Sequence, residues 1–415
     1  VLGLQYATAG YAVGGGAIQR ADPYASANQS PNLRVIDSAL TPTYKASNDV
    51  VEFNADFAVT PELTFASQTG YNHDRIASTE DFNRFTTAPG IFSSNTVPPP
   101  GLFNNILVAP PTPNGQFCDP QLGCSDRLVA EDLSQARSWQ ISQEFRLASK
   151  FSGPFNFNIG GNYLHYETLE DYYVFVNLLT LVTQGINQVG LSQFNQGVGD
   201  FTHCGQDNLI QHNYGNAANA VGSCIYIDTN PLSSLTGNGH NYFRSTNPYT
   251  VNSYAGFGEA YYQITPDLKL TGGLRWTDDQ KHFVDIPSWV AIPGWGYPIT
   301  GIVNQEWKQF TGRFVATWTP KLGFTDQSLF YGSFARGYKG GGANPPGPAV
   351  NAFSSASASV HPLTFAPEFN NAFELGTKNA IGDGAVTLNG DVFYYDYKGY
   401  QISEIIDRTS INLNI

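Results

Sequence analysis

Five pairs of segments in this sequence alternate apolar and polar side chains with a period of two, and a short turn joins the members of each pair. Residues 155–163 read FNFNIGGNY and residues 268–277 read LKLTGGLRWT. Because successive side chains of a strand point to opposite faces, each segment predicts a strand with one apolar and one polar face. The joining turns contain Pro and Gly, which suit tight reversals. They lie at residues 60–62, 152–154, 265–267, 319–327 and 382–384.

The connections between these five pairs are long, so that short and long connections alternate along the chain. Long connections begin near residues 72, 165, 284 and 341. In an antiparallel sheet they therefore all emerge at one end. A transmembrane β-barrel has this asymmetry, with short periplasmic turns and long extracellular loops. A soluble β-sandwich or propeller also carries long loops, but has less reason to confine them to every second connection.

The composition agrees with a membrane barrel. Aromatic residues make up 14% of the chain and charged residues only 13%, a balance that suits interfacial girdles better than a water-exposed surface. The mean hydropathy of −0.24 resembles that of a soluble protein, but strands that alternate apolar and polar residues give the same value. The net charge of −13 argues against nucleic-acid binding, because no basic stripe is present to neutralise phosphates.

The sequence is expected to be part of a longer protein, with residues 1–415 forming a partial barrel domain. Counting residues 1–13 as a strand gives about eleven strands, and an odd number does not close an antiparallel barrel in the usual even-numbered way. The first residues lack the basic and apolar regions of a signal peptide. The last residues lack the aromatic-ended closing strand that such barrels usually carry.

Four cysteines fall into two local pairs, which favours two loop disulfides in an oxidising compartment: Cys118 with Cys124, and Cys204 with Cys224. Free or metal-bound thiols are the alternative. One loop holds both imidazole and thiolate groups, the usual zinc ligands, although their spacing matches no zinc motif. These residues are His203, Cys204, His212, Cys224 and His240. We expect no metal and no cofactor.

Several segments of the sequence resemble the TonB-dependent receptor family of outer-membrane transporters. They are SQEFRLAS at 142–149 followed by GPFNFNIGGNYLHYE, YAGFGEAYYQITPDLKLTGGLRWTDD at 254–279, LFYGSFARGYKGGGAN at 329–344, and FELGTKNAIGDGAVTLNGDVFYYDYKGYQ at 373–401. Each is similar to a hairpin or strand end of that family, and they follow one another in the family's order.

The resemblance implies a barrel of roughly 22 strands, with an N-terminal plug and a coupling box that meets the TonB complex. The plug, the box and the closing strands are not among these 415 residues. The implied function is energised uptake of a scarce nutrient, a ferric siderophore or another organic ligand, across the outer membrane of a Gram-negative bacterium. A passive porin and a surface-displayed adhesin are the alternatives. An enzyme is not expected, because no GxSxG, P-loop or HExxH motif is present.

Charges on the polar faces of the strands are expected to line the barrel lumen, where they either contact a plug or solvate a water-filled interior. The lumen-facing candidates are Glu52, Asp56, Glu144, Arg146, Glu259, Arg275, Arg313, Glu374 and Lys378.

Ligand-binding candidates lie in the loops and at the barrel rim. The aromatic run containing Tyr172, Tyr173 and Phe175 predicts either an exposed binding surface or a segment packed under its own loop. Arg336 and Lys339 are candidates for an anionic ligand or for lipopolysaccharide phosphates, and the alternative is an interfacial anchor with Tyr338 in the aromatic girdle. The remaining loop and rim candidates are Tyr242, Arg244, Trp289 and Trp295.

Overall fold

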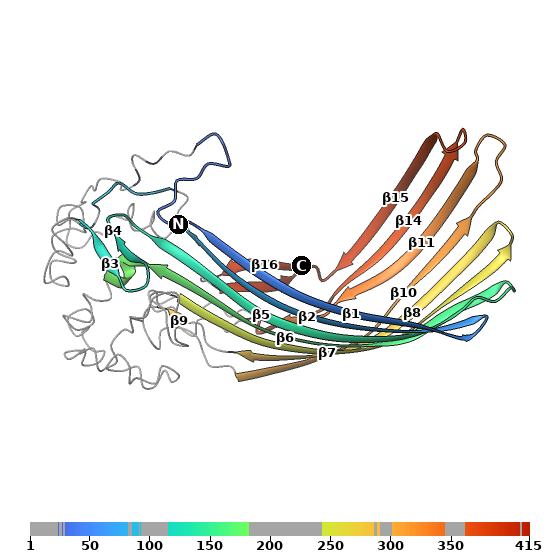
Figure 1. Ribbon diagram of the computed structural model, residues 1–415, viewed down its shortest axis with the longest axis horizontal. Helices are drawn as coiled ribbons and strands as arrows, with labels where there is room; N and C mark the ends of the chain where they lie inside the picture. The colour runs from blue at the N-terminus through green and yellow to red at the C-terminus, as the bar shows by residue number, and fades with distance from the viewer. Residues whose placement is uncertain are drawn as a thin grey trace.

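A computed structural model describes residues 24, 27, 30–81, 85–90, 92, 115–181, 243–285, 289–290, 301–344, 362–406 and 409–415. These residues form one curved antiparallel sheet in the order β1-β2-β5-β6-β7-β8-β10-β11-β14-β15, with β9 (Trp289–Val290) paired to β7 (Figure 1). The strands on the main path are β1 (Thr43–Thr60), β2 (Leu63–Asp81), β5 (Ala130–Ser149), β6 (Phe155–Val176), β7 (Phe243–Thr265), β8 (Leu268–Asp285), β10 (Gly301–Trp318), β11 (Gln327–Lys339), β14 (Glu368–Ile381) and β15 (Val386–Lys398).

The five predicted hairpins are confirmed: β1–β2, β5–β6, β7–β8, β10–β11 and β14–β15. Their short turns gather at one end of the sheet, and the strand ends that the long connections join lie at the other (Figure 1). The turn between β14 and β15 holds Gly382, Asp383 and Gly384 at φ values of 68°, 56° and 79°, a left-handed conformation that glycine adopts without strain. Residues 177–181 are helical. Within the described ranges, no helix has the length and apolar character needed to span a bilayer.

The register of the sheet places apolar side chains of neighbouring strands on one common face. Phe57 lies opposite Phe65, Phe65 opposite Leu147, and Leu147 opposite Ile159. We call this face the outer face. It exposes many large apolar side chains, among them Val51, Phe53, Phe57, Phe145, Phe155, Ile159, Leu274, Phe310, Phe314, Phe334, Leu375 and Val392. Such a continuous band, exposed over the whole sheet, is the surface that a lipid bilayer covers.

The opposite, polar face lines the concave side of the sheet and is called the inner face. Lys281 Nζ of the inner face donates a hydrogen bond of 2.6 Å to the carbonyl oxygen of Gly341, and Gln305 Nε2 donates one of 3.2 Å to that of Gly342. Gly342 begins one of a group of short strands in the concavity, and Gly341 directly precedes it; β16 of this group is visible in Figure 1. The group comprises β12 (Gly342–Ala343), β13 (Thr364–Phe365), β16 (Gln401–Ile406) and β17 (Thr409–Asn414).

A small protein core caps the sheet at the end of the long connections. Phe175 is fully buried and packs with Leu133 and Tyr173, against which Leu122 also packs. Leu122 lies between β3 (Phe117–Asp119) and β4 (Gly123–Ser125), the hairpin that carries the predicted Cys118–Cys124 disulfide. That disulfide is confirmed. The cap therefore combines a cross-linked hairpin with the tops of β5 and β6.

The main path of the sheet begins at β1 and ends at β15, so the described strands do not close on themselves. Each edge strand exposes backbone groups that must be paired where lipid replaces water. The strand predicted at residues 1–13 lies outside the described residues.

Two glycines of the inner face lie beneath aromatic rings of a neighbouring strand. The ring of Phe257 covers Gly160, its register partner, and the ring of Tyr331 covers Gly376. A Cβ atom at Gly160 would lie 2.4 Å from the carbonyl oxygen of Phe145 and 2.6 Å from the Phe257 ring. Glycine at these positions lets the ring cover the backbone of the adjacent strand.

We expect Gly160→Val to destabilise the barrel by about 1–3 kcal/mol, because the new side chain must displace both backbone and ring. Urea titration of the protein refolded in bilayers measures the loss. Gly256→Val is the matched control, because a Cβ atom at Gly256 meets nothing within 4 Å. Equal losses in the two variants would contradict this explanation.

Candidate functional site

All nine predicted lumen-facing charges lie on the inner face. Each alternates along its strand with the apolar residues of the outer face. The tightest pair among them is Glu259 with Arg313. Arg313 Nε and Nη2 lie 2.6 and 3.0 Å from the two carboxylate oxygens of Glu259, a two-pronged contact. The pair bridges β7 and β10 across Gly273 of β8. A Cβ atom at Gly273 would lie 3.0 Å from Glu259 Oε2, so glycine makes room for the bridge.

Five of the other seven inner-face charges also have a local partner: Arg146, Glu144, Glu52, Arg275 and Glu374. Arg146 lies 3.2 Å from Glu144 on the same strand. Glu52 accepts hydrogen bonds of 2.9 Å from Asn54 and 2.6 Å from Gln68. Arg275 lies over the Phe257 ring at 5.7 Å and donates to Thr277, whereas Glu374 accepts the hydroxyl of Tyr331. By register, Asp56 lies opposite Ala66 and Lys378 lies opposite Asn389.

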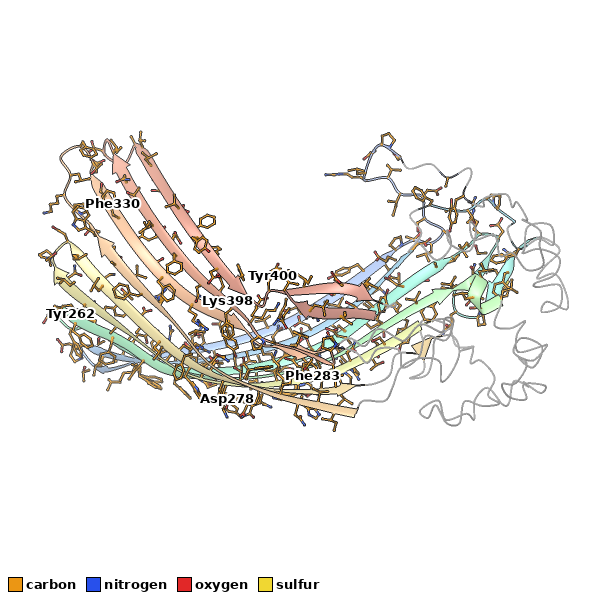
Figure 2. All side chains as sticks on the ribbon, turned by 180° about the vertical axis from the view of Figure 1, so that it is seen from behind. Tyr262, Asp278, Phe283, Phe330, Lys398 and Tyr400 are labelled. Atoms are coloured by element: carbon orange, nitrogen blue, oxygen red, sulfur yellow. A yellow bond between two sulfur atoms is a disulfide. The ribbon has the colours of Figure 1, made fainter. Side chains whose placement is uncertain are left out.

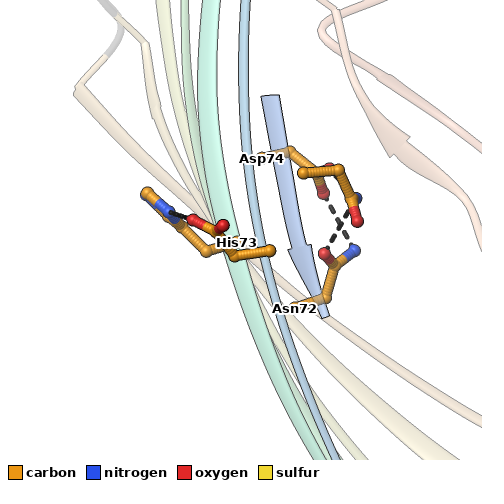
Figure 3. Close-up of polar contacts among 5 residues, drawn as sticks. Asn72, His73 and Asp74 are labelled. Atoms are coloured by element: carbon orange, nitrogen blue, oxygen red, sulfur yellow. Dashed lines mark hydrogen bonds and ion pairs between the residues drawn. The ribbon is translucent and has the colours of Figure 1, made fainter. Parts of the chain in front are cut away.

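Farther from the short turns, the two faces of β1 and β2 carry different polar networks. His73 Nδ1 on the outer face lies 3.6 Å from Asp49. On the inner face, Asn72 donates to Asp74 at 2.9 Å, and Asn48 donates to both. Figure 3 shows these two networks on opposite sides of the strands. At this height on β1 and β2 the outer face has already changed from apolar to polar side chains. The inner face is polar both here and nearer the short turns.

Of the aromatic run at the top of β6, two members are buried in the cap. Tyr173 is 4% exposed and Phe175 is fully buried, and their rings stack at 5.9 Å. Tyr172 has the opposite parity, is half-buried, and donates a 3.3 Å hydrogen bond to Asp132. Tyr172 therefore offers the most accessible surface of the three.

The rim candidates on β11 lie where this strand leaves β10, because the β10–β11 pairing ends at Gly312 and Arg336. The Arg336 guanidinium lies 4.7 Å from the Phe369 ring centroid. Tyr338 stacks on the same ring and donates its hydroxyl to Asp279. Lys339 ends the strand and is exposed. These contacts fix the rim and leave Lys339 accessible to solutes.

Several other candidates lie wholly or partly outside the described residues. Arg244 and Trp289 are register partners in β7 and β9, and only their backbone is described. The residues of which nothing is described are Tyr242, Trp295, Cys204, Cys224 and the three histidines of the alternative zinc site. Within the ranges that the structure covers, no group of three His, Cys, Asp or Glu side chains could hold a metal ion.

One feature of the extracellular end was not predicted: carboxylates face each other across β2 and β5. Glu80 lies opposite Asp132, and Asp81 lies opposite Glu131. Burial, followed by repulsion from Asp81 and Asp132, raises the pKa of Glu131 to about 7. Burial and repulsion from Glu80 raise the pKa of Asp132 to about 6, against the opposing effect of the Tyr172 hydrogen bond. The register reveals these pairs, and the sequence spacing does not.

This arrangement makes the extracellular end of β5 more stable in acid. The folded state keeps protons on Glu131 and Asp132 at pH values where the unfolded chain, with ordinary pKa values of 4.5 and 3.8, has lost them. Stability therefore falls as pH rises from about 4 to about 7. We expect roughly tenfold more hydrogen-exchange protection of residues 130–134 at about pH 5 than at about pH 8, after correction for intrinsic rates. Glu131→Gln/Asp132→Asn should abolish the difference, and the exposed Glu306→Gln should retain it.

A protein-family comparison matches residues 2–415 to the family model described as "TonB dependent receptor-like, beta-barrel". The match covers nearly the whole chain, including the segments that carry the resemblance. No curated protein matches the sequence.

A comparison with solved structures finds, among others, two receptors and one transporter. The ferric-catecholate import receptor Fiu from E. coli K12 is 13% identical with a TM-score of 0.47, covering 91% of this chain and 44% of that chain. The siderophore receptor PiuA from Acinetobacter baumannii is 16% identical with a TM-score of 0.43, covering 84% and 40%. The copper transporter OprC is 10% identical with a TM-score of 0.48, covering 90% and 41%. The chain thus spans less than half the length of these proteins.

Proposed function

This chain belongs to the family of TonB-dependent receptor-like β-barrels, and we propose that it serves energised uptake of a scarce organic nutrient. The sheet is part of a transmembrane β-barrel in the outer membrane of a Gram-negative bacterium. The family match over residues 2–415 is the observation that carries the proposal. The outer apolar band and the charged inner face support it, because a transporter needs a lipid-facing wall and a polar path.

We propose that further strands continue the sheet at its two edges to complete a barrel of roughly 22 strands around a plug. In this proposal TonB acts through a segment ahead of the plug. The inner-face charges would contact that plug. Glu259 and Arg313 already neutralise each other, whereas no ion pair of Asp56 or Lys378 occurs within the described residues. Asp56 and Lys378 are therefore the more available to a plug residue of opposite charge.

A ferric siderophore or another organic compound is the proposed ligand class. The whole chain contains 21 Lys and Arg against 34 Asp and Glu, so its electrostatic field does not favour a strongly anionic chelate. Tyr172 and Lys339 are the proposed contacts among the described candidates. Tyr172 is half-buried with its hydroxyl on Asp132, and Lys339 is exposed at the rim, where it has no ion pair within the described residues.

Uptake by cells that produce the full-length receptor tests the proposal. Accumulation of labelled ferric siderophores should require both the receptor and the proton gradient, so an uncoupler should abolish it. Uptake that persists in uncoupled cells would instead indicate a passive channel. Binding to the cell surface without any accumulation would indicate an adhesin.

A further inference from the structure

Two arginines lie directly opposite each other on the outer face. Arg75 of β2 and Arg137 of β5 are register partners, and both are exposed. Side chains in such positions have Cβ atoms about 4.5–5.5 Å apart, and like charges placed there repel each other. Neither guanidinium forms an ion pair with any residue that the structure describes. No direct ion pair within the described residues therefore relieves the repulsion between the two guanidiniums.

A third cation and three carboxylates lie in positions diagonal to the two arginines on the neighbouring strands. Lys45 of β1 lies diagonally next to Arg75, because Ser47 is the register partner of Arg75. The other diagonal neighbour, Asp49, contacts His73 at 3.6 Å. Diagonal to Arg137 on β6 are two carboxylates, each of which accepts a hydrogen bond from an uncharged donor and keeps its negative charge. Glu167 accepts the indole N–H of Trp139 at 3.2 Å, and Asp171 accepts the hydroxyl of Thr246 at 2.6 Å.

The aromatic residues next to this cluster, on the side of the short turns, indicate its height relative to the membrane. On β2 the last aromatic side chain of the outer face is Tyr71, four residues before Arg75. On β5 it is Trp139, two residues from Arg137. Tyr and Trp mark the boundary between hydrocarbon and headgroups in membrane barrels. Lys45, Arg75 and Arg137 therefore lie at the headgroup level of the outer leaflet.

Two lysines of the outer face on other strands have a carboxylate partner. Lys308 of β10 lies two residues before Phe310 and 2.6 Å from Glu306. Lys398 of β15, labelled in Figure 2, lies 3.6 Å from Asp396. Arg75 and Arg137 differ from these lysines because neither has a direct ion pair within the described residues.

We propose that Lys45, Arg75 and Arg137 form a binding site for a phosphate group carried by a lipid headgroup of the outer leaflet. A phosphate placed between the two guanidiniums relieves their repulsion and accepts two-pronged hydrogen bonds, for which the planar guanidinium is well shaped. A lipid-borne phosphate is held at this height by its own acyl chains, whereas a free anion must be drawn from solution. The inference rests on the outer-membrane location of the chain and does not depend on energised uptake.

Native mass spectrometry of the full-length receptor in detergent, titrated with lipopolysaccharide, tests the site. We expect Arg75→Gln/Arg137→Gln to weaken binding roughly tenfold or more, and added salt to weaken wild-type binding further. Lys308→Gln/Lys398→Gln removes the same charge from compensated positions and should bind like wild type. Heat-modifiable electrophoretic mobility verifies that both variants are folded, and siderophore uptake plays no part in the measurement.

Three results would overturn the proposal. The first is wild-type affinity in Arg75→Gln/Arg137→Gln, and the second is equal binding of dephosphorylated lipopolysaccharide. The third is displacement of the lipid by inorganic phosphate at millimolar concentration, which would assign the site to a soluble anion. If energised uptake fails while the lipid result stands, only the transport proposal is lost.

Discussion

Replacing Ile159 with arginine is expected to reduce the stability of the barrel in a bilayer by about 2–4 kcal/mol. Ile159 is 48% exposed and occupies the middle of the apolar stretch of β6, from Phe155 to Tyr163 on the outer face. A guanidinium at that depth must either enter hydrocarbon or drag water and headgroups toward it. The cost is large because the outer face of β6 offers no carboxylate near this level to pair with the new charge.

The neighbouring substitution Asn158→Arg serves as the control, since it adds the same charge at the same depth on the inner face. Its register partner there is Glu259, so the new cation lies on the polar face beside a carboxylate, which it shares with Arg313. Full-length receptor refolded into bilayers and titrated with urea gives both free energies of unfolding. If the two variants lose equal stability, the assignment of outer and inner faces is incorrect, and the membrane location fails with it.

The strands and their faces could be predicted from sequence because strand periodicity is a local property. FNFNIGGNY fixes the apolar and polar sides of β6 without any knowledge of its neighbours. The Cys118–Cys124 disulfide was likewise predictable, because a separation of six residues suits a small cross-linked hairpin. In both cases the information lies within a few residues of the chain.

Contacts that depend on register could not be predicted in this way. Arg75 and Arg137 are 62 residues apart, and a shift of one residue between β2 and β5 would place them on opposite faces. The same holds for the carboxylates of Glu80 and Asp132. The inward course of residues 340–344 was also missed, because it depends on Lys281 and Gln305 of distant strands.

The aromatic run on β6 shows a second limit, because hydrophobicity alone does not separate a binding surface from a core. Tyr172 and Phe175 were predicted together, either as an exposed binding surface or as a segment packed under its own loop. Strand parity then separates them, with the Tyr172 hydroxyl on Asp132 and the Phe175 ring in the cap. Both sides of the top of β6 are covered, since Val174 and Val176 on the Tyr172 side are buried as well, and this packing depends on segments distant in sequence.

Replacing Phe175 with alanine is expected to cost about 3–5 kcal/mol, nearly all of it in the extracellular cap. The ring is fully buried against Leu133 and Tyr173, so its removal leaves a cavity that the disulfide-linked hairpin closes only in part. Hydrogen exchange should therefore accelerate strongly in residues 117–133 and remain unchanged in residues 155–165, within the bilayer.

Phe53→Ala provides the contrast, because Phe53 is 65% exposed on the outer face of β1 and packs against lipid rather than protein. It should leave exchange in the cap at the wild-type rate. The distinction matters for ligand binding, because Phe175→Ala would then weaken binding through loss of cap order, whereas Tyr172→Phe removes one hydroxyl from a cap that stays folded. Unchanged exchange in residues 117–133 of Phe175→Ala would show that this ring does not hold the cap together, and Phe175 would again be a candidate for direct ligand contact.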